Sequence, residues 1–404
     1  MCGVERVDRV YIHFDYHGFN GFPVEARLPL KPLTATLQAP KATGLNGGAD
    51  FNKNNFDCLR LILASIVALF HMHALTNLPA FEAFDVYLSP QFAVRSFFVI
   101  SGLLIYRSYM RSSSPRSYFE KRIRRIYPAY FTVIALAAIG LFPLSILPAS
   151  QYFGLSFLKY LGANLIFLNF LAPTLPGVFT QNTISAVNGA LWTLKIEVAF
   201  YLFVPILHYL CSRFGTKRVM SLVFLFSCLW KYGLSFLAST GVGSPGFLTL
   251  DRTRNLYAQM DVQFPAQLAY FAAGVLLLLY FDKLKLHFRL IAVVTAVLFL
   301  IDHFFTRGYL DVFWVSGVVF IFGFLHYFGN FSKYGDFSYG VYIIHWPILQ
   351  VLIACGLAAL NPALFFAIAV VAIAVGGFLM WTLVESRFLS GSSHYLQGSA
   401  KAAR

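Results

Sequence analysis

Side chains that can carry or exchange charge interrupt several apolar runs of this sequence. Arg60 opens the run "RLILASIVALFHMH", which contains His71 and ends on His73, and Glu197 lies within "LWTLKIEVAFY". A charged or titratable group in hydrocarbon needs a partner or a function, so Arg60, His71 and Glu197 are candidate site residues. An imidazole exchanges its proton near neutral pH, which suits His71 to acid–base chemistry, while His73 is more simply an interfacial residue.

Further polar groups occur at similar depths in other apolar runs. Ser101 and Gly102 fall near the middle of "RSFFVISGLLIY", and His345 falls near the middle of its own run in "FSYGVYIIHWP". Arg60 precedes His71 by about three helical turns, so the two side chains share almost one helix face. We expect these helices to enclose a polar cavity in a central layer, because each group would otherwise face lipid.

The composition shows what kind of chain must position these groups. Of 404 residues, 58% are hydrophobic and only 12% are charged, and the mean hydropathy is +0.67. These values indicate a polytopic membrane protein. The net charge of +14 does not indicate a nucleic-acid partner, because the Lys and Arg residues lie mainly in short loops, where they set topology and contact anionic lipid. The five cysteines are far apart, so we expect no metal site and no disulfide framework.

Apolar runs of about twenty residues, enough to cross a bilayer, recur from Phe56 onward. We therefore predict an all-α bundle of about ten transmembrane spans. The predicted spans are 58–78, 91–110, 126–148, 191–210, 218–238, 263–281, 288–305, 309–327, 337–356 and 362–384. Residues 1–55 are predicted to be a loosely ordered cytoplasmic extension, residues 56–386 the transmembrane domain, and residues 387–404 a short cytoplasmic tail.

The charges between the runs predict the orientation. The segment from Arg107 to Arg125 holds seven Lys and Arg residues against one Glu, so the end of the second span should be cytoplasmic. Alternation then places both termini in the cytoplasm, provided that the interrupted apolar stretch from Phe157 to Ala172 does not cross. We interpret that stretch as re-entrant or interfacial, within an external segment from about 149 to 190.

Several of these stretches, taken together, resemble the acyltransferase 3 family of integral membrane acyltransferases over about residues 56–386. The motifs appear in the family's order: Arg60 followed by His71, "FFVISG" at 97–102, Arg122-x-x-Arg125, "LWTLKIEVAFYLFVP" at 191–205, and "FSYGVYIIHWP" at 337–347. Thr193 stands where the family more often has serine, which keeps a hydroxyl.

The resemblance implies an enzyme that takes an acyl group, usually acetyl, from cytoplasmic acyl-CoA and delivers it to a hydroxyl, often on an extracytoplasmic glycan. Coenzyme A is a polyanion, so its phosphates need fixed cations at the cytoplasmic mouth. Arg60, Arg122, Arg124 and Arg125 are placed there. The expected cofactor is acetyl-CoA, without a metal.

In the central layer, His71 is the candidate base that takes the proton of the incoming hydroxyl. Glu197 is the candidate carboxylate that orients the His71 ring, as the third member of a catalytic triad does. Ser101, Tyr342 and His345 could contact the acyl group or acceptor, while Gly102 and Trp192 are expected to support packing and anchoring. Direct transfer and a covalent acyl-enzyme both stay open.

Simpler interpretations exist for some of these residues. Arg122 and Arg125 could be topology determinants only, and Lys195 is a rival partner for Glu197. A transporter or flippase of an acyl or glycan intermediate also needs a polar cavity with intramembrane charges, and a scaffold in a glycan-assembly complex is a third class.

The sequence is best interpreted as a bacterial inner-membrane O-acetyltransferase that modifies an exported or cell-envelope polysaccharide, such as an exopolysaccharide. Its expected partners are acyl-CoA, a glycan or lipid-linked glycan acceptor, membrane lipids and glycan-assembly proteins.

Overall fold

The computed structural model describes residues 51, 53–240, 250–329, 331 and 335–389, and every regular element within them is a helix. The prediction of an all-α fold is confirmed. The chain divides into residues 1–38, which lie outside the described part, and residues 39–404, which contain all of the described helices. Most of the predicted extension at 1–55, and the tail from 390 onward, therefore lie outside the described residues.

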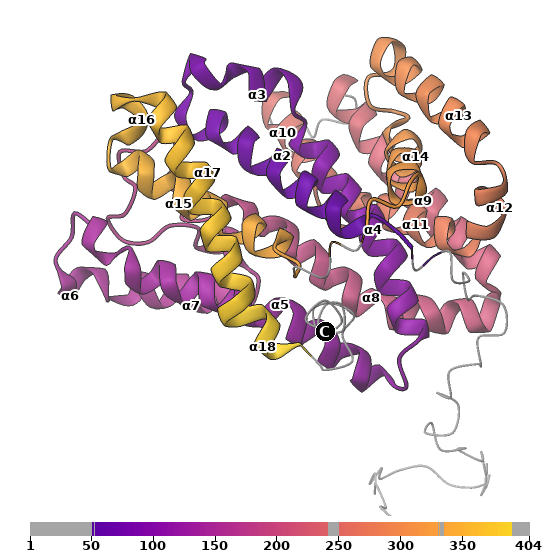
Figure 1. Ribbon diagram of the computed structural model, residues 1–404, viewed down its shortest axis with the longest axis horizontal. Helices are drawn as coiled ribbons and strands as arrows, with labels where there is room; N and C mark the ends of the chain where they lie inside the picture. Colours follow the sequence, from indigo (N-terminus) through magenta and orange to yellow (C-terminus); the bar gives the residue numbers. More distant parts are fainter. Residues whose placement is uncertain (1–50, 52, 241–249, 330, 332–334, 390–404) are drawn as a thin grey trace, which may run out of the picture. The chain divides into compact units, whose positions relative to one another are not determined.

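The longer helices are α2 (Phe56–Thr76), α4 (Pro90–Met110), α5 (Pro115–Gly140), α8 (Trp192–Phe214), α9 (Thr216–Thr240), α10 (Leu250–Asp261), α11 (Phe264–Leu279), α13 (Phe288–Ile301), α14 (Asp311–Phe324), α15 (Ser338–Ala354) and α17 (Pro362–Leu379). The shorter ones are α3 (Glu82–Tyr87), α6 (Ala149–Tyr152), α7 (Leu155–Leu165), α12 (Phe281–Leu286), α16 (Leu357–Leu360) and α18 (Ser386–Phe388). One-turn 3₁₀ segments and two π-helical segments, at Asp302–Thr306 and Met380–Glu385, complete the described part (Figure 1).

Seven helical segments of the described part are long and apolar enough to cross a membrane, and an eighth qualifies if Pro79–Tyr87 and Pro90–Met110, bent by 43°, form one span. The apolar helices α14 and α15 are shorter, at 14 and 17 residues. Each of the ten predicted spans therefore contains a helix. The number that cross the bilayer stays a prediction.

The third predicted span has the wrong boundaries. The sequence placed it at 126–148 after a basic loop, but α5 begins at Pro115 and ends at Gly140. Ser114 caps the helix by accepting a hydrogen bond from the Ser117 amide, and proline at the first helical position is preorganised for a helix start. The basic residues from 116 to 125 consequently lie on a rigid helix instead of a loop.

The stretch from Phe157 to Ala172 forms only the 11-residue helix α7 and a following 3₁₀ turn. A helix of this length extends about 16 Å, roughly half the hydrocarbon thickness of a bilayer. Its end is fixed to α5, because the Tyr130 hydroxyl donates to the Asn164 carbonyl at 2.6 Å. The short length agrees with the expectation that this stretch does not cross.

Helix α4 is at the centre of the described helices and packs against α2, α11, α8 and α14, while α15 packs against both α2 and α17 (Figure 1). The approach of α4 to α11 depends on two glycines. A Cβ added to Gly102 would lie 2.0 Å from the Phe271 carbonyl oxygen, and one added to Gly274 would lie 2.1 Å from that of Val99. Small residues of this kind let membrane helices approach closely.

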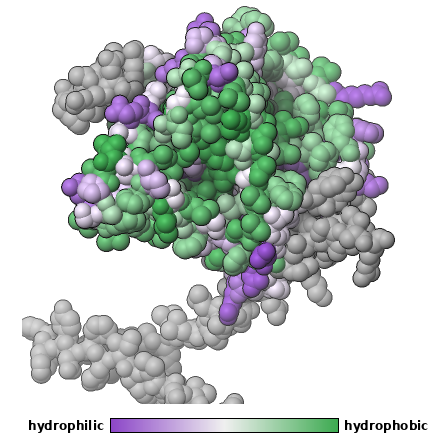
Figure 2. Space-filling view, turned by 60° about the vertical axis from the view of Figure 1, so that its left-hand side comes forward, coloured by the Kyte–Doolittle hydropathy of each residue, from purple (hydrophilic) through white to green (hydrophobic). Residues whose placement is uncertain are grey.

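The outer surface of the bundle is strongly apolar. Figure 2 shows a face that is mostly hydrophobic, with hydrophilic side chains gathered at its margins. Large apolar side chains are exposed on α5, α8, α9, α13 and α17, including Leu136, Ile139, Leu202, Ile206, Leu225, Leu229, Val293 and Val371. Such a surface matches hydrocarbon, so these helices are those of a multi-pass membrane protein.

Candidate active site

A cavity of about 660 Å³ runs beside α4 and is also lined by α2, α5, α8 and α15. Both Val94 and Arg111 line it, so it follows about 26 Å of helix α4. The volume is that of a small-molecule or cofactor pocket. Its basic lining residues are Arg60, Arg107, Arg111, Lys121, Arg122 and Arg125, and polar residues farther along include Ser101, Thr193, Glu197 and Tyr342.

Arg60 and Arg125 take part in a buried cluster of ion pairs that the sequence analysis missed. Arg125 donates to Asp336 at 2.5 Å and to Glu385 at 2.9 Å, and both carboxylate side chains are 1% exposed. Arg60 pairs with Asp57 and lies 3.2 Å from the same Asp336 oxygen. We call these five residues the first ion cluster. Two of the arginines predicted to hold coenzyme A phosphates are thus already bound to carboxylates.

Asp336 precedes α15 and accepts hydrogen bonds from the amide and the hydroxyl of Ser338. Burial by itself raises the pKa of the Asp336 carboxyl, but Arg60, Arg125 and Ser338 together lower that pKa below its ordinary value. Asp336 therefore stays ionised at neutral pH, and its contacts join the start of α15 to α2 and α5.

Arg122 has a different environment from Arg60 and Arg125. It donates to the Ser108 hydroxyl at 2.7 Å, and its guanidinium lies 5.7 Å from the ring centre of Tyr201. Its Nε atom is buried without a hydrogen-bond partner among the described residues. Arg124, two residues on, is exposed and does not line the cavity. Arg122 is therefore better placed than Arg124 to meet an anion in the cavity.

Glu197 lies on the cavity wall between two hydroxyl groups. Ser101 donates to its carboxylate at 2.9 and 3.0 Å, and Tyr201, one helical turn farther along α8, donates to it at 3.0 Å. The structure thus brings Ser101 and Glu197 together from α4 and α8. Lys195, the rival partner, donates instead to Gln263 at 2.8 Å.

His71 does not pair with Glu197, so the expected orientation of its ring by that carboxylate is wrong. The His71 Nδ1 atom lies 2.9 Å from the Nε2 atom of His345, and the two ring planes are nearly parallel, with an angle of 5° between them. The physical reason is the neighbour on the facing helix: α2 packs directly against α15. Neither histidine lines the cavity.

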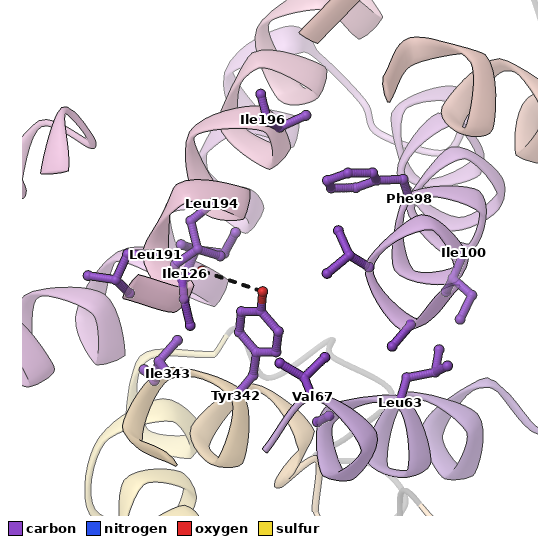
Figure 3. Close-up of a cluster of buried hydrophobic side chains, with 14 of the residues drawn as sticks. Leu63, Val67, Phe98, Ile100, Ile126, Leu191, Leu194, Ile196, Tyr342 and Ile343 are labelled. Atoms are coloured by element: carbon purple, nitrogen blue, oxygen red, sulfur yellow. Dashed lines mark hydrogen bonds between the residues drawn. The ribbon is translucent and has the colours of Figure 1, made fainter. Parts of the chain in front are cut away.

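Tyr342 separates the cavity from the histidine pair. It lines the cavity, and its ring centre lies 5.9 Å from that of His345. Its hydroxyl lies 2.8 Å from the Thr193 hydroxyl. Figure 3 shows the Tyr342 side chain between Val67 on one side and Ile343 on the other, with its hydroxyl directed toward α8. The Thr193 hydroxyl thus has a specific contact.

The segment at 182–190 is attached to α15 beside the histidines, which the sequence analysis did not anticipate. Gln350 donates to the carbonyls of Ile184 and Ala186 at 2.5 and 2.8 Å, and Asn188 donates to that of Ile343 at 2.7 Å. The sequence did contain a signal for this attachment: Gln350 lies within an apolar run and Asn188 lies beside one, and a buried amide side chain needs a hydrogen-bond partner.

The two remaining predicted support residues have packing roles in the structure. Gly102 allows the close approach of α4 to α11 described above. Trp192 begins α8 and is half-buried against the apolar core. Among the described residues, the Trp192 indole makes no hydrogen bond to the cavity's polar groups.

Comparisons with known proteins agree in one family. The profile of the acyltransferase 3 family, an acyltransferase domain, matches residues 53–382. An O-acetyl transferase of Shigella phage Sf6 is 28% identical over 367 residues, which are 84% of this chain and 97% of that protein. Nodulation protein 10 of Rhizobium leguminosarum bv. viciae is 35% identical over 191 residues, which are 45% of this chain and 50% of that protein. The match thus spans about half the length of Nodulation protein 10. No solved structure matches.

Proposed function

The chain belongs to the acyltransferase 3 family and is a multi-pass membrane acyltransferase, and from this membership we propose that it moves an acetyl group from cytoplasmic acetyl-CoA to a hydroxyl of an exported or cell-envelope polysaccharide. The name of the phage relative, an O-acetyl transferase, supports acetyl as the group and oxygen as the acceptor atom. The proposed location is the bacterial inner membrane.

The cavity is the observation that carries this proposal. Its basic end has Arg107 and Arg111 from the end of α4, with Lys121 and Arg122 from the start of α5. Basic side chains grouped in this way suit the phosphates of coenzyme A. The remaining length, toward Val94, would take the pantetheine arm and bring the thioester to Ser101 and Tyr342.

In the proposed reaction, His71 acts as the base that takes the proton from the acceptor hydroxyl. The acceptor oxygen then attacks the thioester carbonyl, an ester forms, and coenzyme A leaves as the thiol. Tyr342, between the cavity and the histidines, is the proposed donor to the oxyanion, and Thr193 would hold its hydroxyl in place. Neither histidine lines the cavity. For the attack to occur, the Tyr342 side chain must therefore allow the acceptor hydroxyl bound at His71 to reach the thioester in the cavity.

Glu197 has a separate role in this proposal. It does not touch His71, and it holds Ser101 and Tyr201 on the wall that faces the acyl donor. A carboxylate there can accept hydrogen bonds from the amide groups of the pantetheine arm.

The first test is transfer of radiolabelled acetyl from acetyl-CoA to envelope glycans in inside-out membrane vesicles. We compare wild-type protein with His71→Ala, Arg122→Ala and Arg124→Ala in a deletion strain, at equal protein content. A charge-assisted hydrogen bond contributes about 1.5–3 kcal/mol, so Arg122→Ala should raise the KM for acetyl-CoA about 10- to 100-fold. Arg124→Ala is the matched control and should leave this KM unchanged.

His71→Ala should abolish ester formation. Full activity of His71→Ala would remove it as the base, and equal KM values for Arg122→Ala and wild type would remove the proposed phosphate site. Label that crosses the vesicle membrane without forming an ester would instead support the transporter hypothesis.

A further inference from the structure

The contacts of His345 determine which of its ring nitrogens carries the proton. Its Nδ1 atom lies 3.3 Å from the carbonyl oxygen of Val341, one turn earlier in α15. A carbonyl oxygen can only accept a hydrogen bond, so Nδ1 must be the protonated nitrogen of a neutral ring. The Nε2 atom of His345 then has a lone pair and can only accept.

This assignment determines the proton position on His71 as well. The His345 Nε2 atom, which accepts, lies 2.9 Å from the Nδ1 atom of His71, so this nitrogen must be the donor. The proton of neutral His71 is therefore on Nδ1, and the lone pair is on Nε2. The described residues offer no hydrogen bond to His71 Nε2, which leaves that atom available to a substrate hydroxyl.

We propose that His345 is a positioning residue that fixes the tautomer and orientation of His71, so that the Nε2 atom of His71 faces the acceptor hydroxyl as the base. The inference rests on the proposed function of the same site. His345 here does with a neutral imidazole what the carboxylate does in a catalytic triad, where it holds the histidine in the correct tautomer.

The surroundings of the pair keep His345 in this position. Its side chain is 0% exposed. The Trp346 ring packs edge-on against the His71 ring, with 4.7 Å between ring centres, and its indole nitrogen donates to the Ala186 carbonyl at 3.1 Å. A Cβ on Gly189 would lie 2.4 Å from the Trp346 ring, so the backbone of the 182–190 segment packs closely against this tryptophan. The His71 ring, which is itself only partly buried, is thereby held on one side by His345 and Trp346, and the 182–190 segment packs on Trp346.

Two amide substitutions at position 345 form a matched test. The amide of glutamine reaches the place of a histidine Nε2 atom and can accept from His71 Nδ1, whereas the shorter amide of asparagine reaches only the place of Nδ1. Loss of the partner that orients a metal-bound histidine typically costs about 10- to 100-fold in metal affinity or activity, and we take the same range for the His71 ring. We therefore expect His345→Asn to lower kcat about 10- to 100-fold, with an unchanged KM for acetyl-CoA, and His345→Gln to restore most of the kcat.

The measurement is steady-state acetyl transfer by purified full-length protein, with unfolding temperatures of each variant recorded in detergent. His303→Asn, a histidine substitution outside the site, is the control and should keep wild-type kcat. Equal losses for His345→Asn and His345→Gln, at unfolding temperatures equal to wild type, would overturn the tautomer role. So would full activity of His345→Asn. If His71→Ala is itself active, the proposed function of the site fails; if His71→Ala is inactive and His345→Asn is active, only the present inference fails.

Discussion

The Arg125 guanidinium binds two buried carboxylates that come from distant parts of the chain, Asp336 and Glu385. A buried ion pair is weak evidence for net stability, because desolvation of the charges offsets their attraction. Removal of one partner is a different matter, since it leaves uncompensated charge in a nonpolar environment. The residue was predicted as a coenzyme A ligand; its contacts now give it a structural role that can be tested separately.

We predict that Arg125→Ala lowers the free energy of unfolding by about 3–5 kcal/mol, the usual cost of breaking a buried pair. Thermal unfolding of the purified protein in detergent measures this. Arg124→Ala, an exposed neighbour, is the control and should unfold as wild type does. If Arg125→Ala unfolds at the wild-type temperature but has a raised KM for acetyl-CoA, Arg125 is a cofactor ligand after all.

At the scale of the elements, helix ends meet in two groups. The first ion cluster joins the start of α2, the first turns of α5, the start of α15 and the π-helical segment Met380–Glu385 that continues α17. The predicted alternation places all four of these ends on the cytoplasmic side. The ion pairs between residues far apart in sequence are therefore consistent with the predicted topology, because all of the paired residues are predicted to lie on the same side of the membrane.

The second group consists of Asp311 with the residues around it. Arg95 lies 2.7 Å from Asp311, Lys231 lies 3.4 Å from it, and Tyr270 donates to it at 2.7 Å. Lys231 also lies 3.6 Å from Asp261. These residues lie in the halves of α4, α9, α10, α11 and α14 that alternation predicts to be nearer the external side. The two groups therefore join helices near both predicted surfaces of the bundle through side chains that are mostly buried.

The contact of α4 with α11 predicts a strong effect of a very small substitution. Gly102→Ala would place a methyl group 2.0 Å from the Phe271 carbonyl oxygen, so the helices must separate. We expect destabilisation of at least about 1–3 kcal/mol, as for an overpacked core, and a lower yield of folded protein in the membrane. Because Ser101 is adjacent, the cavity wall should also shift and activity should fall.

Gly233→Ala in α9 is the matched control, because nothing lies within 4 Å of its added Cβ. It should be neutral, or stabilising by up to about 1 kcal/mol through helix propensity. Chemical or thermal unfolding of both variants measures the difference. A Gly102→Ala protein as stable as Gly233→Ala would contradict the close packing of α4 and α11.

At the scale of the whole molecule, the orientation of the protein in the membrane can be tested by chemical labelling of a native cysteine. Cys355 is exposed at the end of α15, which the predicted topology places on the extracytoplasmic side of the membrane. Cys211 and Cys228 are buried, and Cys58 lies near the predicted cytoplasmic end of α2. We predict that a membrane-impermeant maleimide labels Cys355 in intact cells, and that Cys355→Ser removes this label.

A cysteine on the opposite side completes the test. The Arg116 side chain is 89% exposed near the start of α5, at the predicted cytoplasmic surface. In a Cys355→Ser background, Arg116→Cys should react only after the membrane is permeabilised. Labelling of Arg116→Cys in intact cells would reverse the predicted orientation, and with it the side from which the proposed donor, acetyl-CoA, would enter.

The sequence by itself determined the class of the protein, the positions of the helices and the family. The length and hydrophobicity of an apolar segment determine whether it partitions into hydrocarbon, and this depends little on the rest of the chain. The order of Arg60, His71, Glu197 and His345 could therefore be recognised along one chain. The predicted start of the third span was nevertheless wrong as a helix boundary, because Ser114 and Pro115 start α5 before its basic residues.

Only the tertiary structure decided which of these groups meet. His71 and His345 are 274 residues apart, Arg125 and Glu385 are 260 apart, and Ser101 and Glu197 are 96 apart. Periodicity gives the face of each helix but not its neighbour, since the neighbour depends on how ridges, glycines and loops pack all the helices together. A carboxylate and an imidazole at similar depths looked like partners in sequence, yet packing of α2 against α15 gave His71 another histidine instead.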